Sequence, residues 1–329
     1  MRGIYFDGKR AVYREDLPVP EPAPGHSRIR ILLAGICSTD REILKGYRPD
    51  FRGIMGHEFV GIAEKSEGRP ELLGKMVVGE LNEGCGHCLY CRSGREKHCP
   101  KRKVIGMDGL DGCFAEYMIL ADHLLHEVPE GLPPEQAAYT EPLAAALEIP
   151  SQVHVDPAGK AAVIGDGRLA LMTAQVLSLS GVDLTVIGKH PEKLERFRPY
   201  AKIKMTKDYA PFLTENRAAD FREPEIADTY ELVAEASGSP QGIQLAGLLV
   251  RRKGTIVLKS TYAGSVQLDM SHYVVNEITI VGSRCGPFEP ALNLLSRKKI
   301  TLPDIEWHAL SDFETAFSSR AFKSGFRLM

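Results

Sequence analysis

Three residues with metal-binding side chains lie early in the chain. Cys37 follows an alternating apolar run at residues 29–33, which predicts a strand that ends close to the cysteine. His57 and Glu58 come later, in a segment flanked by glycines that let the backbone approach a ligand. A thiolate, an imidazole and a carboxylate are the ligand types of a catalytic zinc ion, which keeps one position open for water or substrate. Taken singly, Cys37 or His57 would be better explained as a residue of the apolar core.

Four further cysteines favour the metal interpretation, because they form a second and independent signature. They are spaced C-x2-C-x2-C-x7-C within a glycine-rich loop, as Cys85, Cys88, Cys91 and Cys99. Four thiolates could close a tetrahedral structural zinc site. An iron–sulfur cluster is a rival, although a ferredoxin run has a gap of three residues before its last cysteine. A zinc ribbon that contacts nucleic acid is the third possibility, supported only by the basic residues nearby.

The middle of the chain carries a glycine motif in a βαβ context. The apolar run 161–164 predicts a buried strand, and it leads into Gly165-Asp166-Gly167 and then into a helical stripe that reaches Leu179. A second strand is predicted at 184–187. This arrangement is typical of a dinucleotide-binding unit, in which the glycines allow a tight turn and the helix N-terminus faces a pyrophosphate. The candidate cofactor-binding residues are Gly165, Gly167, Arg168, Leu169, Gly188, Lys189 and His190.

The residues after the second strand of this unit bear on the choice of cofactor. A carboxylate commonly stands there, about 20 residues past the glycine loop, and binds the ribose 2′-hydroxyl of NAD. Here the strand is followed by Gly188, Lys189 and His190, and the nearest acid in the sequence, Glu192, comes a turn later. Lys189 could pair with a 2′-phosphate, with His190 as a second donor and no carboxylate to repel it. We therefore predict NADP, the alternative being a solvated lysine and NAD bound through backbone contacts.

The rest of the chain extends these two patterns. Strands predicted at 231–236, 255–258 and 278–281, with a helix at 243–250, indicate a doubly wound parallel sheet. The first part of the chain is β-rich, with short strands at 59–63 and 76–79. Helices are predicted at 135–147, 288–295 and 312–322. Residues 205–228 are polar and irregular, and no role is assigned to them.

Bulk properties exclude several classes of protein. The chain has 329 residues, a formal net charge of −2 and seven cysteines. Charges of both signs are interspersed, which predicts neither a nucleic-acid partner nor a membrane surface. It contains no apolar run of about 18 residues. Clustered cysteines suit metal thiolates in a reducing compartment, so we expect a cytoplasmic protein.

Two segments resemble a known family. Residues 35–40 (GICSTD) and 56–61 (GHEFVG) resemble the zinc-binding segments of the zinc-dependent medium-chain alcohol dehydrogenases, and the resemblance continues to about Gly286. It implies an α/β protein with a GroES-like catalytic domain at 1–143 that carries a structural zinc lobe at 84–100. A Rossmann domain would follow at 144–285, and residues 286–329 would return to the first domain, with the active site in the cleft between them.

The resemblance also implies roles for individual residues. The lobe cysteines would hold a structural zinc, and a second, catalytic zinc would be held by Cys37, His57, Glu58 and Glu141. Glu141 is chosen because a glutamate before Pro-Leu lies at the metal in the polyol, sugar and threonine dehydrogenases. Thr39 would relay the proton of the alcohol, but Glu42 replaces the histidine that often continues the relay, so its onward route is open.

The expected function is hydride transfer between NAD(P) and a secondary alcohol, polyol or sugar CH–OH group. The partners are then a small alcohol or carbonyl substrate and further copies of the chain, in a dimer or tetramer. A zinc-binding regulatory or nucleic-acid module would explain the cysteines but not the glycine motif. A zinc-free enone or quinone reductase would explain the fold but not Cys37, His57, Glu58 and the cysteine lobe.

Overall fold

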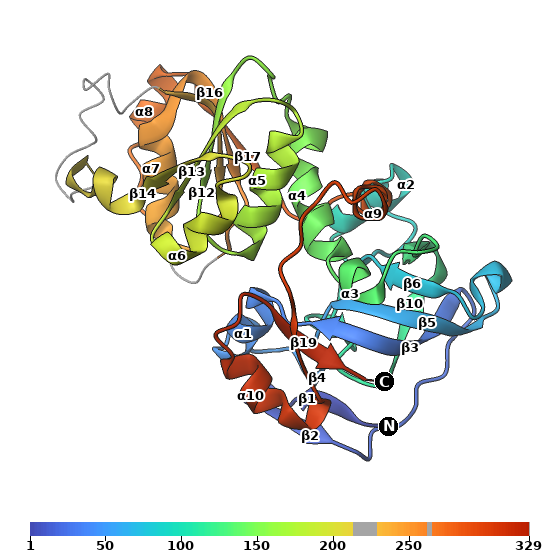
Figure 1. Ribbon diagram of the computed structural model, residues 1–329. Helices are drawn as coiled ribbons and strands as arrows, with labels where there is room; N and C mark the ends of the chain where they lie inside the picture. Colours follow the sequence, from blue (N-terminus) through green and yellow to red (C-terminus); the bar gives the residue numbers. More distant parts are fainter. Residues whose placement is uncertain (213–228, 262–264, 329) are drawn as a thin grey trace. The chain divides into compact units, whose positions relative to one another are not determined.

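The computed structural model describes residues 1–212, 229–261 and 265–328. Contacts within the chain define two compact units (Figure 1). Unit 1 comprises Met1–Glu141 and Phe288–Met329, and unit 2 comprises Pro142–Pro287. The proposed domain boundaries, at 143/144 and 285/286, lie close to these limits. Among the described residues, no helix is both long and apolar enough to cross a membrane.

Unit 1 is built on a seven-stranded sheet in the order β11-β6-β5-β3-β19-β18, with β10 also paired to β3. The strands are β3 (His26–Gly35), β5 (Glu58–Ser66), β6 (Met76–Gly79), β10 (Tyr117–Ala121), β11 (Leu125–Glu127), β18 (Glu306–His308) and β19 (Ser324–Arg327). In the antiparallel pair β3–β5, Gly35 lies opposite Glu58. In the pair β3–β19, Gly35 lies opposite Gly325. Segments far apart in the sequence therefore meet at the end of β3.

Two smaller sheets complete the β-structure of unit 1. One contains β2 (Ala11–Arg14), β1 (Gly3–Phe6) and β4 (Gly53–Ile54), and the other contains β7 (Asn82–Glu83), β8 (Lys103–Ile105) and β9 (Gly109–Leu110). The helices are α1 (Ser38–Leu44), α2 (Leu89–Arg92), α3 (Pro134–Ala137), α9 (Phe288–Ser296) and α10 (Phe313–Ser318). Single 3-10 turns are η1 (Pro70–Leu72), η2 (Glu96–His98), η3 (Asp122–Leu124) and η6 (Leu310–Asp312).

Two predicted helices differ from the structure. The helix expected at 135–147 is two helices, α3 and α4 (Thr140–Gln152). At the break the Thr140 hydroxyl donates to the Ala137 carbonyl at 2.7 Å, in competition with the backbone N–H that a continuing helix would supply. The Tyr139 hydroxyl donates to the Pro303 carbonyl at 2.7 Å. The helix expected at 312–322 ends at Ser318, since the chain turns there toward strand β19.

Unit 2 contains a six-stranded parallel sheet in the order β14-β13-β12-β15-β16-β17. The strands are β12 (Lys160–Ile164), β13 (Asp183–Gly188), β14 (Lys202–Met205), β15 (Tyr230–Glu235), β16 (Val250–Leu258) and β17 (Thr279–Gly282). Helices α5 (Arg168–Ser178) and α7 (Pro240–Leu249) cover opposite faces of this sheet (Figure 1). The shorter elements are α6 (Pro191–Leu194), η4 (Glu195–Phe197), η5 (Thr206–Phe212) and α8 (Met270–Val275). This is the predicted doubly wound sheet.

Strand β14 is an addition to the prediction. It is an edge strand with exposed lysines at 202 and 204, so its sequence lacks the apolar run that predicts a buried strand. It reaches Met205, and η5 follows, so the first residues of the segment 205–228 are ordered elements. Residues 213–228 of that segment lie outside the described part of the chain.

Candidate functional site

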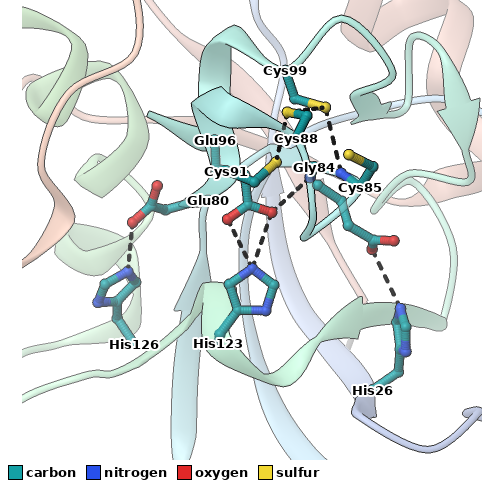
Figure 2. Close-up of polar contacts among 11 residues, drawn as sticks. His26, Glu80, Gly84, Cys85, Cys88, Cys91, Glu96, Cys99, His123 and His126 are labelled. Carbon is teal, nitrogen blue, oxygen red and sulfur yellow. Dashed lines mark hydrogen bonds and ion pairs between the residues drawn. The ribbon is translucent and has the colours of Figure 1, made fainter. Parts of the chain in front are cut away.

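The four lobe cysteines come together in unit 1 (Figure 2). Cys88 precedes the first turn of α2, Cys91 lies within it, and Cys99 ends η2. The ligand atoms of all four lie within 4.8 Å of one another, and the Cys88 sulfur is 3.5 Å from that of Cys91 and 3.7 Å from that of Cys99. Tetrahedral zinc with Zn–S bonds of about 2.3 Å requires sulfurs about 3.8 Å apart. The donor set and spacing therefore fit a closed zinc site, and none of the seven cysteines, all within the described residues, forms a disulfide.

The lobe backbone favours thiolates. The N–H groups of Cys85 and Lys101 donate to the Cys99 sulfur at 3.4 and 3.3 Å. The backbone N–H of His87 lowers the pKa of Cys85 to about 6. Hydrogen bonds from backbone amides stabilise a thiolate as they do any anion, which favours negative sulfur at Cys85. Burial and the neighbouring thiols act in the opposite direction on Cys91 and raise its pKa to about 12.

A carboxylate braces the lobe next to the cysteines (Figure 2). Glu96 accepts a hydrogen bond from the N–H of Gly84 at 2.6 Å and lies 2.9 Å from Nε2 of His123. Since Gly84 precedes Cys85 and Glu96 comes three residues before Cys99, the carboxylate ties together both ends of the cysteine segment. Such contacts behind the ligands commonly fix their orientation.

The second metal-type group is formed by Cys37, His57 and Glu58, whose ligand atoms also lie within 4.8 Å of one another. The antiparallel pairing of β3 with β5 produces this grouping, because Cys37 comes just after β3, His57 directly precedes β5 and Glu58 begins it. His57 and Glu58 are 3% and 2% exposed, whereas Cys37 is half-buried. Three protein ligands of mixed type fit a zinc site that retains an open position.

Asp40 lies behind this group and plays two parts. One carboxylate oxygen accepts a hydrogen bond from the N–H of Cys37 at 2.7 Å, which fixes the start of α1. The other is 3.4 Å from Nδ1 of His57, and within the described chain neither of these two buried atoms has a hydrogen-bond partner. Burial lowers the pKa of His57, but Asp40 and Cys37 raise it by more, so the pKa lies well above its ordinary value. A carboxylate behind a ligand histidine is a common support of metal sites.

Lys323 is the residue that sequence reasoning missed. Its ammonium forms an ion pair with Glu58, and both residues are almost fully buried. It also lies 5.4 Å from the ring centroid of Tyr139, in a cation–π arrangement. A buried carboxylate needs a counter-charge, and Lys323 supplies one. No spacing rule could have found it, because 265 residues separate it from Glu58 and only the pairing of β19 with β3 joins them.

The remaining candidates of unit 1 are placed as follows. Glu141 lies in the first turn of α4 and is partly exposed. Among the described residues, the group of ligand atoms within 4.8 Å does not include it. The Thr39 hydroxyl lies 3.7 Å from the Cys37 sulfur, and Glu42 pairs with exposed Lys45 at 2.8 Å. Cys113 is fully buried with its thiol near the Glu58 carbonyl.

The glycine loop of unit 2 joins β12 to α5. Gly165 has φ of +129°, and a Cβ there would lie 2.5 Å from the Ala236 carbonyl oxygen, so the turn requires glycine. Gly167 caps α5, and no atom lies within 4 Å of the position its Cβ would take. Arg168 and Leu169 form the first turn of α5 and are partly exposed. The sheet order reverses beside β12, which is where such folds bind dinucleotides.

One expectation about this loop is wrong. The sequence suggested that no carboxylate stands at the end of β13, but the Asp166 side chain reaches that point from the glycine loop. Its Oδ2 accepts hydrogen bonds from the backbone N–H groups of Lys189 and His190 at 2.7 and 2.9 Å and lies 3.0 Å from Nδ1 of His190. Gly188 is required here, because a Cβ would lie 2.8 Å from that of Asp166. Asp166 was not predicted to lie here, because it comes before β13 in the sequence and the acid was expected after that strand.

Comparisons with known proteins agree with both units. The family model of the alcohol dehydrogenase GroES-like domain matches residues 23–130. A sorbitol dehydrogenase of Halalkalibacterium halodurans is 31% identical over 322 residues, covering 93% of this chain and 91% of the relative. An L-threonine 3-dehydrogenase of Pyrococcus furiosus is 29% identical, covering 94% and 92%.

A solved structure extends the agreement to the fold. An alcohol dehydrogenase from Thermus sp. ATN1 is 25% identical and superimposes with a TM-score of 0.87 over 100% of both chains. None of these three relatives is, by its name, a regulatory module or an enone reductase. With matches that span both units, the chain belongs to the zinc-dependent medium-chain alcohol dehydrogenase family.

Proposed function

We propose that this chain transfers a hydride between NAD(P) and the CH–OH group of a secondary alcohol, polyol or sugar. The observation that carries the proposal is the presence, in one chain, of an open three-ligand metal group and a βαβ glycine loop. The sorbitol dehydrogenase relative supports a polyol substrate. Steady-state assays with a panel of polyols, aldoses and simple alcohols, each with both cofactors, test the substrate class.

Each residue of the site has a role in this reaction. Cys37, His57 and Glu58 would hold a zinc ion, with Glu141 as a further oxygen ligand. A bound zinc supplies Lewis-acid polarisation of the substrate oxygen, and the nicotinamide supplies the hydride acceptor. Thr39, beside the Cys37 sulfur, would accept the hydroxyl proton. Lys323 would hold the Glu58 carboxylate ionised and fixed in orientation.

The choice between NAD and NADP depends on two opposing charges. Lys189 follows β13 and is exposed, as the predicted preference for NADP requires. Asp166 removes the second premise of that prediction, since its carboxylate stands where none was expected. The preference for NADP therefore rests on Lys189 alone, and the ratio of kcat/KM values with the two cofactors decides it.

We also propose a cytoplasmic homo-oligomer. Seven cysteines that form no disulfide within the described residues suit a reducing compartment. Strand β17 pairs with β16 on one side and with no other strand of the described chain, which leaves an open sheet edge. Ile280 on this strand is 37% exposed, and Val274 and Val275 of the preceding helix are 73% and 79% exposed. An open edge beside exposed apolar residues is suited to pairing with a second copy.

Metal removal should distinguish the two zinc sites. A chelator is expected to remove the zinc of the Cys37 group first, since that site keeps an open position while four thiolates close the lobe site. Activity should vanish when about one of two zinc ions is gone, with the circular dichroism spectrum unchanged. In Glu141→Ala the first zinc should leave at lower chelator concentration if Glu141 is a ligand. Iron and sulfide in the purified protein, or full activity with one zinc, would contradict this model.

Substitutions at the Cys37 group should separate metal chemistry from cofactor binding. Cys37→Ala is expected to abolish turnover and to leave the dinucleotide dissociation constant unchanged, because the thiolate serves the metal only. Thr39→Val should lower kcat while both metals stay bound. Cys285→Ala is the matched control, since Cys285 belongs to neither metal group. Loss of dinucleotide affinity in Cys37→Ala would argue against this division of roles.

The buried ion pair should be visible in stability. Lys323→Met leaves the Glu58 carboxylate without its counter-charge and is expected to destabilise the metal-free protein by about 3 kcal/mol or more. Adding Glu58→Gln should recover part of that loss. Lys65→Met, which breaks an exposed pair with Glu21, should change stability by less than about 1 kcal/mol. Equal urea midpoints for the two lysine variants would contradict the assigned role.

The open edge predicts a change of oligomeric state. Ile280→Lys places a charge on the exposed edge strand and should shift the protein toward monomer in light scattering. Leu73→Lys is the control, because Leu73 is 48% exposed and belongs to unit 1, whereas β17 belongs to unit 2. A wild-type monomer, or an oligomer that Ile280→Lys leaves intact, would exclude β17 as the interface.

A further inference from the structure

Asp166 occupies the variable position between the two loop glycines, yet its carboxylate serves the end of the neighbouring strand β13. We propose that Asp166 is a specificity-determining residue that recognises the ribose 2′-hydroxyl of the dinucleotide and opposes a 2′-phosphate. The proposal rests on the proposed function, since it takes the glycine loop of unit 2 to be the dinucleotide site.

The Asp166 carboxylate is held in one orientation through one of its two oxygens. All three of its contacts use Oδ2: the N–H groups of Lys189 and His190, and Nδ1 of His190. Within the described residues Oδ1 accepts no hydrogen bond, and the side chain keeps 12% of its exposure. A ligand hydroxyl could therefore donate to Oδ1 without displacing any protein contact.

The position also matches what the fold demands of a ribose-binding acid. In a doubly wound sheet the dinucleotide runs across the carboxyl ends of the strands, and its adenosine ribose meets the end of the second strand of the βαβ unit. That strand is β13, and Asp166 bonds the two residues that directly follow it. The usual acid is supplied by the strand end itself; here the glycine loop supplies it.

The carboxylate is ionised at neutral pH. Burial raises the pKa of Asp166, but the backbone N–H groups of His190 and Lys189 and the His190 ring outweigh burial and lower it. A fixed negative charge repels a 2′-phosphate, whereas it accepts a hydrogen bond from a 2′-hydroxyl. Both effects favour NAD. The exposed Lys189 side chain acts in the opposite direction, as a mobile cation in solvent.

Removing the charge while keeping the shape tests the proposal. Asp166→Asn retains an oxygen that can accept the Lys189 and His190 amides. The ratio of kcat/KM with NADP to kcat/KM with NAD should rise about 10-fold or more, and the ratio of NADPH to NADH affinities should rise with it. Asp156→Asn is the matched control, because Asp156 also accepts a loop N–H, from Ala158 at 2.9 Å, and its ratio should not move.

A second variant covers the case in which Asp166→Asn fails to fold. Lys189→Ala alters an exposed side chain and leaves the Asp166 carboxylate in place. Raising the salt concentration should then improve NADPH binding relative to NADH binding, because salt screens repulsion.

Three outcomes would overturn the inference. In Asp166→Asn, an unchanged cofactor ratio, or an equal loss with both cofactors, would make Asp166 a brace of the loop only. In Lys189→Ala, a relative affinity for NADPH that falls or stays constant with salt would do the same. A wild-type chain that binds neither NADH nor NADPH would overturn the proposed function itself, which is a distinct result.

Discussion

The pairing of β3 with a partner on each side decides where the metal-binding side chains of unit 1 lie. Strand β5 on one side places His57 and Glu58 beside Cys37, and β19 on the other brings Lys323 to the same point. The side-chain period of a strand is two, so a slip of one residue in either pairing would turn these side chains to the opposite face of the sheet. The register of three strands is therefore as much a part of the site as the ligands are.

The two cysteine-containing groups use the cysteine sulfur in two different kinds of site. The lobe uses four sulfurs from a short loop whose amides already favour thiolates, so its coordination can be complete. The Cys37 group mixes three ligand types, with His57 and Glu58 buried and Cys37 half-buried, and the Glu58 carboxylate also pairs with a lysine. A site with fewer and harder ligands exchanges them more easily, as a catalytic site must.

How much of the site is visible in the sequence depends on how local each feature is. The lobe spacing, the two zinc-type segments and the glycine loop are short patterns, and each coincides with a grouping or turn in the structure. Lys323 carries no local signal, because only the sheet topology brings it to Glu58. Asp166 was included in the glycine motif, but its role at the end of β13 was not predicted. The rule for the ribose-binding acid places it about 20 residues after the loop, so it does not consider a residue of the loop itself. The break before α4 was not predicted either. One contact of Tyr139, which lies at the break, is with the carbonyl of Pro303, far along the chain.

The ion pair of Glu58 with Lys323 has a consequence for biosynthesis. All of unit 2 lies between the two residues in the sequence, so a ribosome completes the dinucleotide unit before it adds the lysine. Until then the nascent first segment holds a carboxylate whose burial is unfavourable without a counter-charge. The ion pair can therefore form only after translation has passed the inserted unit, and such a non-local contact forms slowly. Unit 1 should accordingly reach its final packing around Glu58 only when strand β19 pairs with β3.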